Sequence, residues 1–392
     1  DKNAKPRVLT ITQSTYDGIL YNVEDIKQEL DGKIDTLHFD EAWLPHAAFH
    51  DFYGDYHAIG ADRPRCKESM VFATQSTHKL LAAFSQASMI HIQESDKRKI
   101  DTTRFNDAFM MHGSTSPHYG IIASCDVASK MMEGDAGKSL VQEMHDEAVA
   151  FRRAMLHVSE DLGRDDWWFK VWQPDGVERT LAKGDSSKPM VTSRPDWYLR
   201  PDARWHGFDN LADDYVLIDP VKVTLLTPGL SMDGEMGKLG IPAAILSKFL
   251  WSRGITVEKT NLYSVLFLFS MGITKGKWST LLTELLEFKR LYDANVPLLD
   301  ALPSIAREGG ARYAGMGLRD LCDELHGCYR ENATAKALKH MYTVLPQVAI
   351  KPADAYDKLV RGEVEAVPIE QLEGRLAAVM LVPYPPGIPL IM

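Results

Sequence analysis

Residues 7–40 read RVLTITQSTYDGILYNVEDIKQELDGKIDTLHFD, and this stretch decides the fold class. Arg7 to Thr12 alternates and is rich in β-forming residues, which predicts a strand. Asn22 precedes two acidic residues, as expected of a helix N-cap, and Gly32 is suited to end that helix. Ile34 to Phe39 is then expected to form a second strand. A strand, a helix and a strand in such a short stretch form a βαβ unit, which implies a parallel sheet.

The same mixture of elements recurs further along the chain. Pro242 predicts the first turn of a helix that Gly254 ends. Ile255 to Glu258 and Ser264 to Ser270 are expected to be strands, and Ser279 to about Asp293 a leucine-rich helix. We therefore expect an α/β protein with a mainly parallel sheet flanked by helices. The stretch between residues 165 and 204 is rich in Trp, Asp and Pro, which favours an irregular insertion.

The composition is that of an ordinary globular protein. Of its 392 residues, 45% are hydrophobic and 25% are charged, and the length predicts more than one structural unit. A formal net charge of -10 argues against a nucleic-acid partner, because phosphate binding requires a basic surface. The densest apolar run, Val265 to Phe269, is far shorter than the ~20 residues of a membrane span. Four irregularly spaced cysteines favour reduced thiols and a cytoplasmic location.

The strongest chemical signal lies in residues 71–85, VFATQSTHKLLAAFS. Lys79 is a single lysine within an apolar segment, directly after His78 and close to the hydroxyls of Ser76 and Thr77. Burial of an amine without a partner favours its neutral, nucleophilic form, which carbonyl chemistry requires. The neighbouring donors are suited to hold an anion such as a phosphate. An isolated lysine is more often a solvated surface residue, so the surrounding residues carry this interpretation.

Two further polar features are candidates for a site. Asp40 follows the second predicted strand, at the edge where parallel sheets bind ligands, although a turn or a helix cap also explains an aspartate there. Residues 112–120, HGSTSPHYG, are either a polar loop before a helix or an anion cradle of hydroxyls and amides.

Two apparent motifs are rejected. The three histidines between residues 46 and 57 resemble a metal site, but Pro45 and Gly54 interrupt the helix that would align them, so we expect no metal. Residues 134–139, GDAGKS, resemble a phosphate-binding loop, but Met132 stands where its first glycine is required.

The run from Thr74 to His91, TQSTHKLLAAFSQASMIH, strongly resembles the cofactor-lysine segment of the bacterial ornithine/lysine/arginine decarboxylases. These are pyridoxal-phosphate enzymes of the aspartate-aminotransferase fold, fold type I. The resemblance covers nearly the whole chain, and residues 80–83 and 87–89 are most similar to the lysine decarboxylases. Further matches lie at Ser14–Gly18, His38–Asp40 with Trp43, Thr115–Gly120, Trp205–Phe208, Asp219–Pro220 through Thr227–Gly229, Val257–Thr260 and Tyr384–Gly387.

The resemblance implies an aspartate-aminotransferase-like α/β domain followed by smaller α+β domains. Residues 1–133 correspond to the C-terminal part of the large cofactor-binding domain, and residues 134–295 to the small domain. Residues 296–392 correspond to an incomplete C-terminal decarboxylase domain. Relatives extend beyond both ends, so we expect a portion of a longer polypeptide. The N-terminal wing, the loop that holds most of the cofactor phosphate and the ring-stacking histidine would lie upstream.

The same resemblance assigns roles to five residues around pyridoxal 5'-phosphate. Lys79 would hold the cofactor covalently, and Asp40 would pair with the pyridine nitrogen and keep it protonated. Trp43 would wall the ring pocket. Ser76 and His78 would bind the phosphate, and Lys79 or His78 could return the proton to Cα.

Three more residues follow from the resemblance. Ser114 would reach the cofactor phosphate of a neighbouring subunit, which implies a homodimer with shared active sites, and relatives assemble such dimers into decamers. Glu258 and Tyr384 would line the substrate entrance, where a carboxylate can receive a distal ammonium. The implied reaction converts L-lysine to cadaverine and CO2, a step that consumes a proton and so fits acid stress or polyamine supply. Arginine or ornithine remains open as the substrate, as do a transaminase and a non-catalytic regulatory paralogue that binds decarboxylase subunits.

Overall fold

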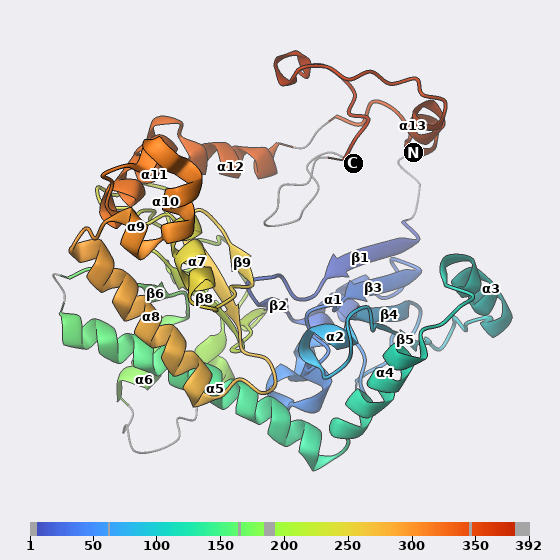
Figure 1. Ribbon diagram of the computed structural model, residues 1–392. Helices are drawn as coiled ribbons and strands as arrows, with labels where there is room; N and C mark the ends of the chain where they lie inside the picture. Colours follow the sequence, from blue (N-terminus) through green and yellow to red (C-terminus); the bar gives the residue numbers. More distant parts are fainter. Residues whose placement is uncertain (1–5, 62, 164–165, 184–192, 345–346, 381–392) are drawn as a thin grey trace. The chain divides into compact units, whose positions relative to one another are not determined.

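The structure is a computed structural model that describes residues 6–61, 63–163, 166–183, 193–344 and 347–380 (Figure 1). It contains two compact units. The first comprises Asp1–Leu226 with Leu266–Lys289, and the second comprises Thr227–Val265 with Arg290–Met392. The domain limits expected at residues 133 and 295 stay predictions.

A four-stranded sheet carries the candidate site in the first unit (Figure 1). Its order is β1 (Val8–Thr12), β3 (Thr36–Asp40), β4 (Met70–Gln75) and β5 (Met89–Gln93). The first three strands are parallel, and β5 is antiparallel to β4. The predicted parallel βαβ unit is confirmed, with α1 (Val23–Leu30) between β1 and β3.

Local sequence explains why this unit forms. The Asn22 side chain accepts a hydrogen bond from the Asp25 N–H at 3.2 Å, which caps α1 as expected. Gly32 follows the helix with φ +77°, a conformation that glycine adopts without strain. Alternation along β3 buries Leu37 and Phe39 against an apolar cluster that includes Val23 of α1. The alternate residues, among them Asp40, remain half-buried.

The described residues form two further sheets. The short strand β2 (Ile19–Tyr21), which the sequence did not predict, pairs antiparallel with β7 (Val216–Ile218). A second four-stranded sheet has the order β6-β8-β10-β9, with β6 at Lys170–Val171, β8 at Lys222–Leu226, β9 at Lys259–Thr260 and β10 at Ser264–Leu268.

One expected strand is wrong. Residues 255–258 contain no strand, and the strand begins at Lys259 instead. The Ile255 N–H donates to the Leu250 carbonyl at 2.9 Å, and Gly254 has φ +78°. This backbone therefore terminates the preceding helix, α7 (Ala243–Ser252), instead of joining the sheet.

The helices of the described residues fall on both units. The helix expected from residue 279 to 293 is confirmed and begins earlier, at Lys275. The expected irregular insertion is correct only in part, because residues 165–204 include the helix Asp175–Lys183 and the fully buried Trp197. No described helix is both long and apolar enough to cross a membrane. The remaining helices are α2 (Thr77–Leu80), α3 (Thr102–His112), α4 (Tyr119–Met131), α5 (Asp135–Leu162), α6 (Asp175–Lys183), α8 (Lys275–Asp293), α9 (Leu298–Ala301), α10 (Pro303–Gly309), α11 (Leu318–Glu331), α12 (Thr334–Thr343) and α13 (Pro352–Val360).

Candidate active site

The carboxyl ends of the parallel strands bring the two principal candidates to one sheet edge. Asp40 is the last residue of β3 and is in register with Thr74 of β4. After Gln75 the chain turns at Ser76 into α2, which carries Lys79. The edge beyond the carboxyl ends of strands is where α/β proteins bind ligands. The structure thus places Asp40, Ser76 and Lys79 at one edge, and the strand-end position of Asp40 is the one that the sequence predicted.

The amine of Lys79 lies over an aromatic ring. Its Nζ lies 4.9 Å from the centroid of the Trp43 ring, within the range of a cation–π contact. Tyr16 packs against the same ring, with 4.7 Å between centroids. Trp43 is 8% exposed, so its ring is fixed by packing.

The segment before Lys79 contains two hydroxyl groups that do not take part in capping the helix. Ser76 caps α2, but its side chain makes no capping hydrogen bond. The hydroxyl of Thr77 is buried and has no hydrogen-bond partner among the described residues. A buried hydroxyl without a partner is costly, which indicates that a further group satisfies it. The donor set beside Lys79 therefore fits a phosphate.

His78 has a defined orientation. Its Nδ1 lies 2.7 Å from the Ala87 carbonyl oxygen, which can only accept, so Nδ1 donates. Within the described part of the chain, Nε2 has no hydrogen-bond partner. In the neutral ring, Nε2 is the nitrogen that can accept a proton or a hydrogen bond.

Asp40 presents a half-buried carboxylate. Its Oδ1 accepts a hydrogen bond from the Ala42 N–H at 3.2 Å. Its backbone carbonyl accepts from the Gln13 N–H at 2.7 Å, which fixes the strand end. Oδ2 has no hydrogen-bond partner among the residues that the structure describes. This carboxylate can therefore receive a protonated ring nitrogen.

A second carboxyl, that of Glu41, joins the ends of β3 and β4. Its Oε1 accepts from the Ala58 N–H at 2.6 Å, and its Oε2 accepts from the Gln75 side-chain amide at 2.8 Å. Glu41 is fully buried, and this burial raises its pKa from 4.5 to about 7 despite both hydrogen bonds. Sequence reasoning did not identify Glu41 as a titratable group of interest.

Glu41 makes stability depend on pH in a defined direction. Between pH 4.5 and 7 the folded protein binds this proton more tightly than the unfolded chain does, so the free energy of unfolding falls as pH rises. Glu41→Gln removes this dependence. We expect the parent to lose about 2–3 kcal/mol more than the variant between pH 5 and pH 8, measured by urea unfolding. The exposed Glu143→Gln is the control, and equal pH slopes in parent and Glu41→Gln would refute the assignment.

A buried ion pair lies beneath Trp43. Lys222 and Asp219 are both fully buried, with Nζ 3.2 Å from Oδ2. Lys222 also donates to the Trp43 carbonyl at 3.0 Å. Sequence reasoning assigned no role to either residue. The available signal was a lysine directly before the apolar run of β8, the same kind of signal that identified Lys79.

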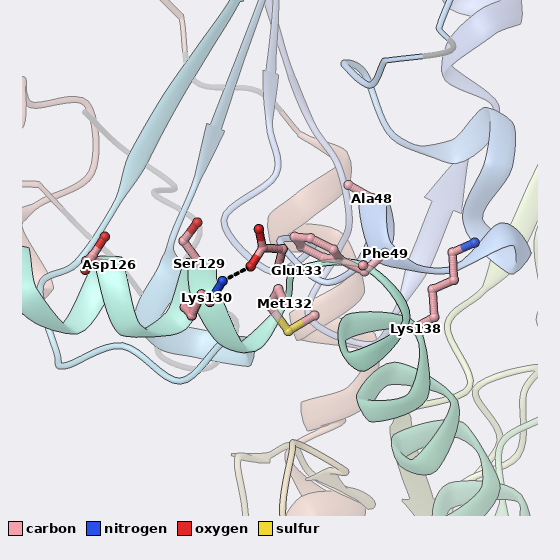
Figure 2. Close-up of a pocket in the computed structure, with 9 residues that line it drawn as sticks. Ala48, Phe49, Asp126, Ser129, Lys130, Met132, Glu133 and Lys138 are labelled. Atoms are coloured by element: carbon pink, nitrogen blue, oxygen red, sulfur yellow. Dashed lines mark hydrogen bonds and ion pairs between the residues drawn. The ribbon is translucent and has the colours of Figure 1, made fainter.

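A separate groove of about 550 Å³ lies where α4 ends and α5 begins (Figure 2). It is lined by Ala48, Phe49, Asp126, Ser129, Lys130, Met132, Glu133, Gly134 and Lys138. Figure 2 shows the ion pair between Lys130 and Glu133 among these side chains. No predicted site residue lines it, and within the described ranges no cluster of His, Cys, Asp and Glu could hold a metal ion.

Comparison with known proteins identifies the family. The family model described as Orn/Lys/Arg decarboxylase, major domain, matches residues 1–277, and the model of the C-terminal domain of the same family matches residues 335–392. The chain belongs to the Orn/Lys/Arg decarboxylase family.

Relatives within the Orn/Lys/Arg decarboxylase family differ in their sequence identity to this chain. Lysine decarboxylase LdcA of Pseudomonas aeruginosa is 64% identical over 391 residues, covering 100% of this chain and 51% of the relative. The biodegradative arginine decarboxylase of Escherichia coli is 42% identical, covering 99% and 52%. The inducible ornithine decarboxylase of the same organism is 32% identical, covering 99% and 53%. The chain thus spans about half the length of these relatives.

Solved structures confirm the expected fold. The structure of lysine decarboxylase A from Pseudomonas aeruginosa superimposes with a TM-score of 0.92 at 63% sequence identity. It is matched over 100% of this chain and 51% of the other. This chain therefore has the fold of the Orn/Lys/Arg decarboxylases.

The three remaining predicted site residues lie apart from this edge in sequence. Ser114 is exposed in the loop between α3 and α4, where its Oγ accepts from the Ser116 N–H at 3.1 Å. Glu258 is half-buried in the second unit, directly before β9. Tyr384 lies outside the described residues. The roles of all three stay predictions.

Proposed function

We propose that the protein is a pyridoxal 5'-phosphate-dependent decarboxylase that converts L-lysine to cadaverine and CO2. The observation that carries this proposal is the placement of Asp40 and Lys79 at one sheet edge, with the Trp43 ring against the Lys79 amine. The greater identity to lysine decarboxylase LdcA than to the arginine and ornithine enzymes supports lysine as substrate.

Each residue at the edge has a task in this reaction. When bound, pyridoxal phosphate supplies an electron sink for the pair left on Cα as CO2 departs. Asp40 holds a proton at the ring nitrogen through its carboxylate, and Lys79 anchors the cofactor through its amine. Ser76 and Thr77 donate hydroxyl hydrogen bonds to the phosphate. Trp43 packs beside the amine and limits the access of water.

The proton that replaces CO2 on Cα comes from a group near Lys79. His78 is suited to this step, because the hydrogen bond to Ala87 fixes its ring and leaves Nε2 to carry the proton. Lys79 itself is the other candidate. Each turnover consumes one proton from solvent, in keeping with a role in acid stress or polyamine supply.

Substrate selection is proposed for Glu258 and Tyr384. The Glu258 carboxylate, with Tyr384, would receive the distal ammonium of the substrate by a charge-assisted hydrogen bond. Lysine, ornithine and arginine differ in the length and shape of that distal group, so this contact would discriminate among them.

The decisive assay compares decarboxylation of lysine, arginine and ornithine by the full-length protein with added pyridoxal phosphate. We expect the highest kcat/KM with lysine. Higher turnover of arginine or ornithine would retain the chemistry and overturn the substrate. No turnover of any of the three would favour the non-catalytic regulatory paralogue.

We further propose that a second copy of the chain completes the site. Helices α3 and α4 flank the loop of Ser114, and α3 buries no residue. Exposed apolar side chains on these helices define the α3–α4 surface: Phe109, Met110, Met111, Tyr119, Ile122 and Val127. Such a patch on a protein surface marks an interaction site. We propose that this surface forms a homodimer and that such dimers assemble into decamers. We also propose a cytoplasmic location, because all four cysteines are free.

Charges on the α3–α4 surface should dissociate the dimer. Met111 and Tyr119 are 80% and 79% exposed, so Met111→Asp with Tyr119→Asp is not expected to disturb the fold of the monomer. We expect a shift to monomer in sedimentation velocity, with loss of turnover. Trp251→Asp, at an apolar position 66% exposed on α7, is the control. An unchanged oligomeric state of the double variant would refute this interface.

A further inference from the structure

The ammonium of Lys222 is buried at the base of the candidate site and has three contacts. It lies 2.5 Å from the Ser14 hydroxyl, 3.0 Å from the Trp43 carbonyl oxygen and 3.2 Å from the Asp219 carboxylate. The first two contacts are hydrogen bonds that Lys222 donates, and the third is an ion pair. None of the catalytic steps described above uses this buried lysine.

Asp219 is fixed in turn by a buried network. Its Oδ1 accepts from the Tyr53 hydroxyl at 2.7 Å and from the Val221 N–H at 3.2 Å, and its Oδ2 lies 3.3 Å from His46 Nε2. Burial alone would raise the pKa of the Asp219 carboxyl, but Lys222, His46 and the Tyr53 hydrogen bond hold it well below its usual range. Asp219 is therefore a carboxylate, and the Lys222 side chain is held in one position.

The neighbouring histidines add no positive charge near pH 7. Burial lowers the pKa of His46 below its usual value. Burial also lowers the pKa of His145, whose Nε2 lies 2.8 Å from the Tyr53 hydroxyl, to about 3. Both rings are therefore neutral near pH 7. The buried Arg152 donates to the Lys222 carbonyl at 3.0 Å. Lys222 and Arg152 both interact electrostatically with Asp219.

Lys222 and Lys79 interact electrostatically. Burial lowers the pKa of Lys222, Asp219 opposes this effect, and the positive charge of Lys79 adds to it. The carboxylate of Asp17 acts on Lys222 in the same sense as Asp219. Because an interaction between two charges is mutual, the ammonium of Lys222 also disfavours a positive charge on Lys79.

We propose that Lys222 is a positioning residue for Lys79: it fixes the main chain of Trp43, whose ring lies against the Lys79 amine, and it favours the neutral form of that amine by charge repulsion. This inference rests on the proposed role of Lys79 as the cofactor lysine. A neutral amine is the form that attacks a carbonyl group, so Lys222 prepares Lys79 without touching the substrate. Lys222 is fully buried, so solvent screens its charge less than it would screen a surface charge.

The test measures the Lys79 amine directly in the apoprotein. In the full-length protein, acetic anhydride acetylates neutral amines, and peptide mass spectrometry quantifies acetylation at Lys79 as a function of pH. We expect Lys222→Met to move the midpoint of this profile up by about one pH unit, which slows acetylation about tenfold at pH values below the midpoint. This readout does not depend on turnover by the loaded enzyme.

A second buried lysine provides a matched control. Lys27 is 3% exposed, pairs with Glu24 at 3.0 Å and donates to two backbone carbonyls, so Lys27→Met removes a similar ion pair without changing the surroundings of Lys79. If Lys222→Met does not fold, Lys222→Met with Asp219→Asn removes both charges, and we expect a smaller shift in the same direction.

The outcomes separate this inference from the proposed function. An acetylation profile of Lys79 that coincides in parent and Lys222 variants would overturn the positioning role, even if Lys79 of the parent retains pyridoxal phosphate. A shifted profile would support the positioning role, even if the cofactor were bound through another residue. Equal shifts in the Lys222 and Lys27 variants would also overturn it, because they would indicate a general loss of stability.

Discussion

Replacing Lys79 with alanine is expected to lower lysine turnover by at least about 10³-fold and to abolish covalent retention of pyridoxal phosphate. The amine is the only nucleophile that the account assigns to the cofactor, and alanine can replace neither its bond nor its charge. Steady-state CO2 release by the full-length variant, together with absorbance of the protein after gel filtration, measures both effects.

The control for this variant is a lysine with an ordinary surface environment. The Lys97 side chain is 67% exposed and pairs with Glu68, so Lys97→Ala should leave turnover and cofactor retention unchanged. If Lys79→Ala keeps more than a tenth of the parent activity, Lys79 does not hold the cofactor.

Replacing Asp40 with asparagine is expected to lower kcat by about 10²–10³-fold while the cofactor stays bound, a loss typical of a removed charge-stabilising contact. Asparagine has the same shape and can still accept the Ala42 hydrogen bond, so the strand end is preserved. What it lacks is the negative charge that keeps a proton on the ring nitrogen. Single-turnover kinetics with lysine measure the chemical step separately from product release.

A matched aspartate separates charge from structure in this experiment. Asp25 is exposed in the first turn of α1, so Asp25→Asn changes the net charge equally but leaves the sheet edge unaltered. Equal kcat values for Asp40→Asn and Asp25→Asn would contradict the role of Asp40 and would favour a site that performs no ring chemistry.

Local sequence was sufficient to predict the part of the fold that holds the site. The alternation in β1 and β3 and the Asn22 cap of α1 are properties of neighbouring residues, so they could be read directly and placed Asp40 at a strand end. Lys79 was found because a lone lysine in an apolar run is costly to bury.

Features that depend on distant residues could not be read in this way. Strand β2 has only three residues and pairs with β7, almost 200 positions later in the chain, so no local period marks it. Glu41 and Lys222 owe their properties to burial and to partners that only the folded chain brings close. Residues 255–258 have a strand-like composition, but their backbone serves to end α7.

The most direct test of the account is to locate the cofactor on the chain. Borohydride reduction of the full-length protein incubated with pyridoxal phosphate fixes the bond between cofactor and lysine, and peptide mass spectrometry then identifies the modified residue. We expect the pyridoxyl group on the peptide that contains Lys79, and its absence from Lys222 of the parent. A stoichiometric label on another lysine, or no label under conditions that support turnover, would contradict the account.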